Sequence, residues 1–321
     1  MSSPVNAVLT GTFTSDGALR QIALPSGYTE FDLVNITDIG DAGATTQVMR
    51  AHSYSSLPAG SAYLNLKTNG AATLAIESMI TTAGFTFVAD SGLVPLGAAV
   101  AITAITQAGS AIASSASAAV VGDVVRIYGT TAMLQVASMD FSVTAVNPGV
   151  AQTFGYLNSA GFAAAATAGF MRIVPFNPRY YPRRRFITAI TLAASAVITM
   201  SVTHGYVVGE KVRIIVPVEF GMTQINGTLA TITAINAGTN TITVDVNSTA
   251  FTAFAFPTSA IAAAGVNYAQ VVPVGEAATG AYANLLDDAT VNQSFRGVLV
   301  GTGVQTTGKL YQWIAKKGLS I

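Results

Sequence analysis

The chain contains no cysteine and very little charge. Its 321 residues include 15 Lys and Arg, 15 Asp and Glu and 2 His, so 9% are charged and the formal net charge is zero. The absence of cysteine excludes disulfide bonds, thiol catalysis and cysteine metal sites, while it leaves the redox compartment open. A soluble monomer usually carries more surface charge. We therefore expect subunits that bury much of their surface against one another.

Long uncharged segments are a consequence of this composition. No charged residue lies between Asp90 and Asp123, a length that could span a bilayer. These segments are rich in Ser, Thr and Gly and alternate as strands do, which disfavours insertion as a helix. The N-terminal sequence MSSPVNAVLTGTF lacks the basic start and apolar run of a signal peptide. We therefore expect no membrane association.

The clearest secondary-structure pattern lies in residues 186–256. Apolar and polar residues alternate strictly over residues 241–246, which is typical of a half-buried strand. Residues 229–235 form a second β-prone run, and the intervening Asn-Ala-Gly-Thr-Asn suits a hairpin because Gly and Asn tolerate positive φ. Several short strands joined by tight turns predict a small barrel, which we expect to be SH3-like.

An earlier stretch of the chain is a degraded copy of this one. The matching blocks, earlier copy first, are residues 102–106 with 187–191, 121–127 with 208–214, 133–136 and 142–147 with 222–225 and 231–236, and 172–175 with 270–273. Their order is kept and their spacing drifts by a few residues. The period is longer than that of solenoid repeats. Two tandem domains are the simpler interpretation.

The predicted fold is all-β and multi-domain, with tandem small SH3-like β-barrel repeats and a β-sandwich-like N-terminal unit. Its segments are an N-terminal β domain at 1–94, a first repeat at 95–178, a linker with the second repeat at 179–276, and a C-terminal β segment at 277–321. Residues 71–79 could form a short helix. Residues 298–303 and 310–315 are predicted to form a terminal strand pair. If that pair completes the N-terminal unit, the repeats are an insertion.

The sharpest break in composition is NPRYYPRRR, residues 177–185, which fits an extended linker. Arginine and tyrosine suit contact with phosphate or with an acidic partner. They equally suit carboxylates and carbonyls of a neighbouring domain or subunit. A neutral chain lacks the broad basic field that nucleic-acid binding uses, which favours the second interpretation. The candidate partner-contact residues are Arg179, Tyr180, Tyr181, Arg183, Arg184 and Arg185.

Candidate catalytic residues are sparse. The histidines are His52, to which we assign no role, and His204, which lies beside Gly205 and is expected to make a turn-stabilising hydrogen bond. The carboxylate pairs considered are Asp38 with Asp41 and Asp287 with Asp288, and loop capping accounts for them. Gly301–Gly303 lacks the flanking pattern of a nucleotide-binding loop. We predict no catalytic, cofactor or metal site and no enzyme activity.

The second repeat resembles a known module. The segments THGYVVGEKVRI (203–214) and GMTQINGTLATITAINAGTNTITVD (221–245) are similar to a module of tailed-phage proteins. That module is often described as similar to the first catalytic cysteine half-domain of ubiquitin-activating enzyme. The description concerns a β-barrel shape. Since this chain has no cysteine, the resemblance implies no ubiquitin chemistry.

Three further segments extend the resemblance over most of the chain. They are YYPRRRFITAIT (180–191), VVPVGEAATGAYANLLD (271–287) and GVLVGTGVQTTGKLYQWIAKKG (297–318), and they resemble a structural-protein family of environmental phages. The first repeat departs from the module. It has Ser117-Ala118-Ala119 where the second has His204-Gly205-Tyr206, and Ala137-Ser138 where the second has Asn226-Gly227. The resemblance implies a component of the virion, assembled in the bacterial host cytoplasm.

The expected function is therefore a non-catalytic bacteriophage structural protein on the capsid exterior, as a decoration protein or head fibre. We expect a homo-oligomer whose partners are the major capsid protein or tail proteins. The alternatives are a tail component (tube, adaptor or fibre-anchoring protein) and a carbohydrate-binding adhesin. A glycan hydrolase comes last. The hints of an adhesin, all explicable as core or interface residues, are Tyr28, Tyr54, Tyr63 and Trp313.

Overall fold

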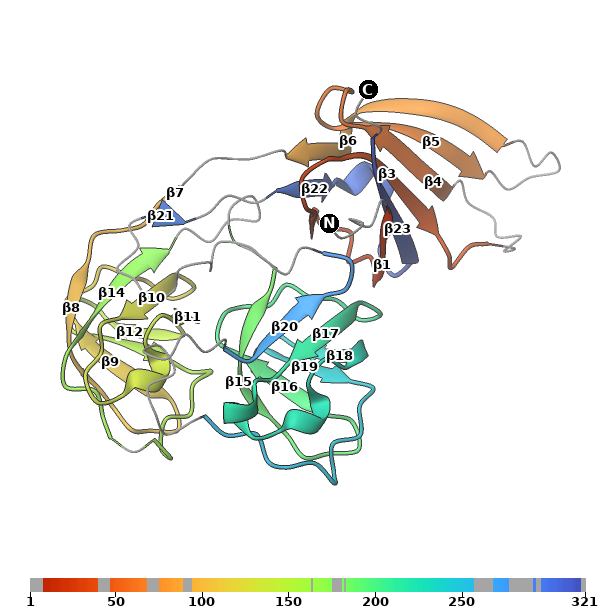
Figure 1. Ribbon diagram of the computed structural model, residues 1–321. Helices are drawn as coiled ribbons and strands as arrows, with labels where there is room; N and C mark the ends of the chain where they lie inside the picture. The colour runs from red at the N-terminus through yellow and green to blue at the C-terminus, as the bar shows by residue number, and fades with distance from the viewer. Residues whose placement is uncertain are drawn as a thin grey trace, which may run out of the picture.

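The computed structural model describes residues 8–39, 47–67, 75–88, 94–162, 164–174, 181, 183–256, 268–276, 291–292 and 296–318. Over these residues it consists of strands and single-turn 3₁₀ helices, so the all-β, multi-domain prediction is confirmed. Figure 1 shows an N-terminal sheet (red and orange, with blue C-terminal strands) above two smaller units coloured yellow-green and green-cyan. Within the described ranges, no helix has the length and apolar character needed to cross a membrane.

The N-terminal sheet is one eight-stranded antiparallel sheet with the order β1-β23-β3-β4-β5-β6-β22-β2. It curls around its own core, where Phe31 meets Phe85 edge-on at 5.1 Å between ring centroids and stacks on Trp313 at 6.0 Å. Its strands are β1 (Val8–Thr14), β2 (Arg20–Ala23), β3 (Tyr28–Asn35), β4 (Gln47–Tyr54), β5 (Ser61–Lys67), β6 (Ala75–Val88), β22 (Gly297–Val300) and β23 (Leu310–Lys317).

The C-terminal strands both belong to this sheet, but they do not pair with each other. β22 lies between β2 and β6, and β23 lies between β1 and β3. The prediction of a terminal strand pair is therefore wrong. A 3₁₀ turn, η5 (Thr302–Val304), follows β22. The buried Gln305 then donates to the carbonyls of Ala18 (2.8 Å) and Gly301 (3.1 Å), which directs the chain across the sheet and not into a hairpin.

The helix expected at residues 71–79 is also wrong where the structure describes it. Residues 75–79 begin β6, and each pairs with β5, from Ala75 opposite Lys67 to Met79 opposite Tyr63. Cross-strand pairing overrides the local helical preference of an Ala- and Leu-containing segment. The remainder, residues 71–74, lies outside the described residues.

The first repeat is a seven-stranded sheet with the order β11-β10-β14-β8-β9-β13-β12. β9 lies within an Ala- and Ser-rich stretch, residues 108–119. The elements are β8 (Val100–Ile105), β9 (Ala111–Ser115), β10 (Val124–Tyr128), η1 (Leu134–Val136), β11 (Asp140–Ser142), β12 (Ala145–Asn147), β13 (Ala151–Phe154) and β14 (Gly169–Val174). Beside it, β7 (Val94–Pro95) pairs with β21 (Val291–Asn292).

The second repeat is a closed six-stranded barrel with the order β15-β16-β19-β18-β17-β20. Ile242 and Val244 of the alternating stretch point into its core. The elements are β15 (Arg185–Ile190), β16 (Val197–Met200), β17 (Lys211–Ile215), η2 (Val218–Phe220), η3 (Thr223–Ile225), β18 (Leu229–Asn236), β19 (Thr241–Val244) and β20 (Gln270–Pro273).

Both repeats follow the same path through space. Each strand of the barrel has a counterpart with the same neighbours in the first repeat, except at β18. The start of β18 pairs with β17 and its end pairs with β19, which closes the barrel. In the first repeat two short strands, β11 and β12, divide these pairings between them. The first repeat is thus the same design, interrupted at Val143-Thr144.

The strand pairing corrects the sequence match of residues 172–175 with 270–273. Ile127 and Ile214, which the sequence aligns, pair with Met171 and Val271 respectively. On their other side, Met171 pairs with Val100 of β8 and Val271 pairs with Arg185 of β15, which are again equivalent positions. Met171 is therefore the counterpart of Val271, and the match of 172–175 with 270–273 is shifted by two residues. Short Val/Ile-rich strands align almost equally well in either register.

Ser159 and Ser248 are a further pair of equivalent residues in the two repeats. The Ser159 hydroxyl donates to the Thr106 carbonyl at 2.7 Å, and the Ser248 hydroxyl donates to the Thr191 carbonyl at 2.7 Å. Each serine oxygen also accepts the N–H of the residue two positions after that threonine, Ala108 or Ala193, at 3.1 Å. The serines lie in NSAGF (158–162) and NSTAF (247–251), a fifth matching block that could have been recognised from the sequence.

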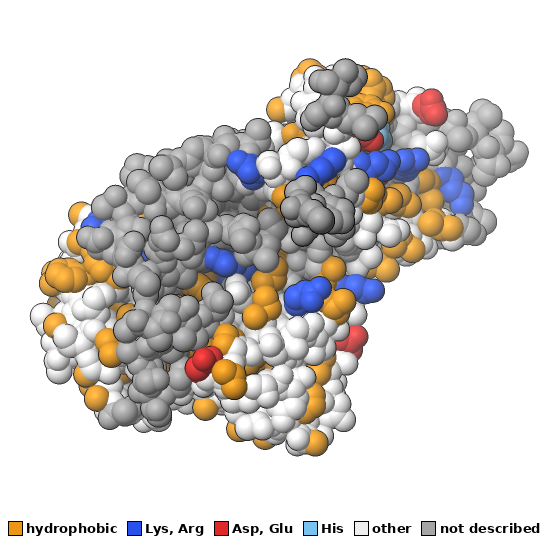
Figure 2. Space-filling view, viewed as in Figure 1, with side chains coloured by type: hydrophobic (Ala, Val, Ile, Leu, Met, Phe, Trp, Pro, Cys, Tyr) orange, Lys and Arg blue, Asp and Glu red, His pale blue; other side chains and the backbone are white. Residues whose placement is uncertain are grey.

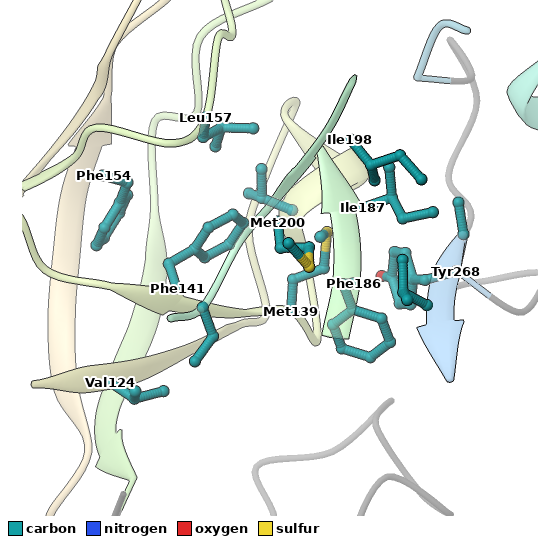
Figure 3. Close-up of a cluster of buried hydrophobic side chains, with 14 of the residues drawn as sticks. Val124, Met139, Phe141, Phe154, Leu157, Phe186, Ile187, Ile198, Met200 and Tyr268 are labelled. Carbon is teal, nitrogen blue, oxygen red and sulfur yellow. The ribbon is translucent and has the colours of Figure 1, made fainter. Parts of the chain in front are cut away.

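The two repeats share one hydrophobic core. Buried side chains of the first repeat, including Met139 and Phe141, belong to the same cluster as Phe186, Met200 and Tyr268 of the second. Figure 3 shows Met139 beside Met200, with Phe141 on one side and Phe186 and Tyr268 on the other. Backbone hydrogen bonding continues across the boundary, since Ser142 N–H donates to the Ser201 carbonyl at 2.9 Å. The repeats therefore form one packed body.

The second repeat also packs closely against the N-terminal sheet. Thr14 N–H donates to the Val208 carbonyl at 3.2 Å, and Val207 lies within the core of the N-terminal sheet. At Gly275, which has φ +81°, a Cβ would lie 2.4 Å from the Thr10 carbonyl oxygen and 2.7 Å from the Trp313 ring. Only glycine allows this approach of the two units.

A pair of glycine substitutions tests this contact. Gly275→Ala and Gly227→Ala both place alanine at positive φ, but nothing lies within 4 Å of the Cβ that would be added at Gly227. We expect Gly227→Ala to cost about 1–2 kcal/mol of unfolding free energy from backbone strain. Gly275→Ala should cost about 1–3 kcal/mol more, from overpacking. Urea denaturation followed by Trp313 fluorescence measures both. Equal losses would contradict the close contact.

Candidate functional site

The predicted partner-contact segment lies at the junction of the three units. Tyr181, Arg183 and Arg185 are buried and Arg184 is partly buried, while Arg179 and Tyr180 lie outside the described residues. Arg185 is the first residue of β15. The described part of the segment is therefore buried between the units, where its side chains contact carboxylates and carbonyls.

Arg183 connects the N-terminal sheet to the barrel. Its guanidinium donates to the Glu210 carboxylate and, at 2.9 Å, to the Gln21 carbonyl of β2, and its Nε lies 3.4 Å from Glu276 Oε2. Arg20 of β2 reaches the same Glu210 at 2.5 Å. Glu276, just after β20, accepts from the Ala23 N–H at 3.0 Å. Residues far apart in the sequence thus form one ionic cluster.

The ionic cluster is buried and balanced in charge. Its two arginines, Arg20 and Arg183, and two glutamates, Glu210 and Glu276, have side chains at most 7% exposed. Burial raises the pKa of Glu276 to about 7, although Arg183 opposes the shift. For Arg183, burial lowers the pKa, but Glu210 and Glu276 outweigh it and the net pKa is above the ordinary value. Burial lowers the pKa of Arg20 despite Glu210.

A second buried pair connects the same segment to the first repeat. Arg126 of β10 donates to Asp140 through Nε (2.8 Å) and Nη2 (3.1 Å), and the Tyr181 hydroxyl donates to Asp140 Oδ2 at 2.9 Å. The Arg185 guanidinium lies over the Tyr181 ring at 5.1 Å and its Nε donates to the Thr203 carbonyl at 2.7 Å. Residues 181–185 thus contact all three units.

Glu210 lies in a turn that both repeats share, but it makes contacts that its counterpart Asp123 does not make. In the first repeat, Asp123 accepts from the Val120 N–H at 2.9 Å, which closes its own turn. Glu210 accepts from the equivalent Val207 N–H at 3.3 Å and also binds both arginines. The longer glutamate side chain reaches beyond the turn. Sequence comparison aligned the two acids but gave no sign of this contact.

The expected turn hydrogen bond of His204 is confirmed. Its Nδ1 accepts from the Tyr206 N–H at 2.9 Å. Burial, with Arg185 nearby, lowers the pKa of His204 to about 4. In the first repeat the Ser117 hydroxyl accepts from the Ala119 N–H at 3.2 Å, so serine fills the same role. The turn that the two repeats share requires a hydrogen-bond acceptor at this position, and that acceptor need not be an imidazole.

Of the four carboxylates considered as candidates, the structure describes one, Asp38. Asp38 is buried and accepts from Asn35 Nδ2 and Lys309 Nζ, both at 2.7 Å. Asp41, Asp287 and Asp288 lie outside the described residues. Among the residues that the structure describes, no group of three or more His, Cys, Asp or Glu side chains could hold a metal ion.

The aromatic candidates divide into two classes. Tyr28 and Trp313 are core residues of the N-terminal sheet. Tyr54 and Tyr63 are exposed, at 42% and 45%. They lie on the outer face of the sheet near Asp32, Arg50 and His52, a cluster that sequence reasoning missed because its members come from separate strands.

Comparisons with known proteins give no family for the chain. No protein-family model matches it, and no curated protein matches it closely.

Removing Arg183 tests the importance of the ionic cluster. Arg183→Ala leaves two buried carboxylates with Arg20 as their remaining cation, and we expect a loss of about 3–5 kcal/mol in unfolding free energy. Arg213→Ala, at an exposed position of β17, should change it by less than about 0.5 kcal/mol. Arg183→Lys should recover part of the loss, since it keeps the charge but not the guanidinium geometry. Similar effects of the two alanine variants would contradict the assignment.

The His204 pKa predicts a dependence of stability on pH. The unfolded chain binds a proton here near pH 6.5 and the folded chain near pH 4, so acidification through this window favours unfolding. His204→Ser copies the first repeat and removes the titrating group. We expect its stability loss between pH 7 and pH 4 to be smaller than that of the wild type by up to about 3 kcal/mol. If the variant loses as much stability between pH 7 and pH 4 as the wild type, the lowered pKa of His204 is contradicted. NMR titration of His204 provides a direct check.

Proposed function

We propose that this chain is a non-catalytic structural protein of a tailed-bacteriophage virion, placed on the capsid exterior as a decoration protein or head fibre. The observation that carries the proposal is the construction of the junction. Arg183 joins β2 of the N-terminal sheet to both Glu210 and Glu276 of the second repeat. A buried, charge-balanced ionic cluster is closed to a substrate, but it fixes the relative positions of the units. A rigid multi-unit β body is suited to repeated packing.

The surface composition supports an assembly role. On the described faces visible in Figure 2, both repeats are largely uncharged, whereas Lys and Arg gather around the N-terminal sheet and its border with the second repeat. Large apolar side chains are exposed on the turns of the first repeat, with Val120 at 58%, Val121 at 59% and Val150 at 55%. Contact with other copies or with the major capsid protein would remove such side chains from water.

The resemblance to tailed-phage proteins supplies the biological setting of the proposal. The segments that carry it, residues 203–214 and 221–245, contain the turn that supplies Glu210 and the strand that closes the barrel. A tail component, such as a tube, adaptor or fibre-anchoring protein, would use the same rigid architecture. The two locations differ in the number of copies that one particle carries.

Copy number per particle is the test. We expect purified phage particles to contain this protein in large, symmetric number relative to the major capsid protein, on the order of hundreds of copies. Quantitative mass spectrometry with isotope-labelled peptides measures the ratio. Imaging of labelled particles separates a capsid exterior location from a long tail tube. A few tens of copies or fewer would favour the tail alternative, and absence from particles would overturn the virion proposal.

A further inference from the structure

The outer face of the N-terminal sheet carries a groove that the assembly role does not use. It has a volume of about 470 Å³ and crosses β3, β4, β5 and β6. Its walls include Arg50, His52, Tyr54, Tyr63, Asn65 and Glu77. The volume lies within the range of small-ligand sites, about 300–1,000 Å³. The groove is on the opposite side of the sheet from the core residues Phe31, Leu33 and Ala51, which alternate with its own lining residues along the strands.

Asp32 binds three of the basic side chains that line this groove. Its carboxylate is 1% exposed and accepts from Arg50 Nε (3.0 Å) and Nη2 (2.7 Å) and from Lys316 Nζ (3.2 Å), and it lies 2.8 Å from His52 Nδ1. Burial alone raises the pKa of Asp32, but the hydrogen bonds from Arg50, His52 and Lys316 outweigh burial and hold the pKa below its ordinary value. The three basic side chains are thereby held in fixed orientations.

His52 has unused hydrogen-bonding capacity. With Nδ1 directed at Asp32, its Nε2 is buried and has no hydrogen-bond partner among the described residues. The Tyr54 ring packs edge-on against the imidazole, with 4.4 Å between centroids. An unpaired buried polar atom is costly. Among the described residues, this nitrogen therefore stays unsatisfied beside the groove.

Two tyrosine rings stand at the rim of the groove. Tyr54 is 42% exposed and Tyr63 is 45% exposed. Tyr63 is paired directly with His52, so Tyr54 and Tyr63 are diagonal neighbours on adjacent strands, roughly 7–8 Å apart at the backbone. Each ring offers an apolar face and a hydroxyl at low conformational cost.

The charges in the groove have no dominant sign. Arg50 and Lys316 are opposed by Glu30 and Glu77. An anionic ligand such as a nucleic acid would require a net positive lining, whereas these four lining charges cancel. The balance instead favours a neutral molecule with many hydroxyl groups and apolar ring faces.

We propose that this groove binds a neutral oligosaccharide. The tyrosine rings of Tyr54 and Tyr63 contact the apolar faces of the sugar rings, while Arg50, Asn65 and Glu77 form hydrogen bonds with the hydroxyls. The site goes beyond the assembly role and is independent of it, since it depends on the local geometry of β3 to β6 and of Lys316 on β23. A virion protein with such a site would attach to glycans through its N-terminal sheet.

Binding of the full chain to an array of immobilised neutral oligosaccharides tests the proposal. The array should cover hexose, deoxyhexose and N-acetylhexosamine termini, and isothermal titration should follow with the free oligosaccharide that binds best. We expect Tyr54→Ala and Tyr63→Ala each to weaken binding by about tenfold or more. Phe170→Ala removes a similarly exposed aromatic ring, at 45%, from the first repeat and should leave binding unchanged.

Each result bears on the proposal. Saccharide binding that needs both tyrosines but not Phe170 supports it. Absence of binding across the array overturns it, as does binding that survives both tyrosine substitutions. If no saccharide binds but the tyrosine variants fail to associate with purified phage particles, the face is a protein contact, and the proposal fails while the virion role stands. Circular dichroism shows that each variant is folded.

Discussion

The buried pairing of Arg183 with Glu210 and Glu276 is the interaction on which the arrangement of this molecule depends. It lies where β2, the turn before β17 and the end of β20 meet, and each of these comes from a different part of the chain. Burying ions is expensive, and a buried ion pair need not be more stable than apolar packing. Its effect is directional, because the guanidinium must face both carboxylates and the Gln21 carbonyl at once. The ionic cluster therefore specifies one relative position of the sheet and the barrel.

The two repeats share one strand arrangement but make different contacts with their neighbouring units. Both keep the serine, Ser159 or Ser248, that holds the start of the loop after β8 or β15. Both also keep the turn acceptor, Ser117 or His204. They differ where they meet other units. Asp123 caps only its own turn, whereas Glu210 extends into the junction. Asp140 of β11 instead pairs with Arg126 and accepts from Tyr181. The repeats thus differ at these contacts between units, while the hydrogen bonds of the shared loop and turn remain similar.

The distribution of polar groups separates the rigid interior from the surface available to partners. The acids and bases of the junction are paired with one another, and the described carboxylates are engaged in hydrogen bonds or ion pairs at Asp32, Asp38 and Asp140. The repeats present a surface with few charges, which suits contact with other protein subunits (Figure 2). The outer face of the N-terminal sheet differs, because it combines exposed tyrosines with oriented polar side chains. Assembly and ligand recognition can therefore use separate faces.

The sequence by itself determined the all-β class, the tandem repeats, the β18–β19 hairpin and the turn bond of His204, because alternation, glycine turns and short-range hydrogen bonds are encoded locally. It also limited the roles open to the arginine segment, although a solvated linker and a buried junction look alike in composition. Only the tertiary structure decided that Arg183 meets Glu210 and Glu276, that β22 and β23 join separate strands, and that Tyr54 and Tyr63 share a groove while Trp313 is buried. These contacts join residues far apart in the sequence. A strand's alternation shows which side chains share a face but not which strand lies beside it, so its partners follow from the packing of the whole chain.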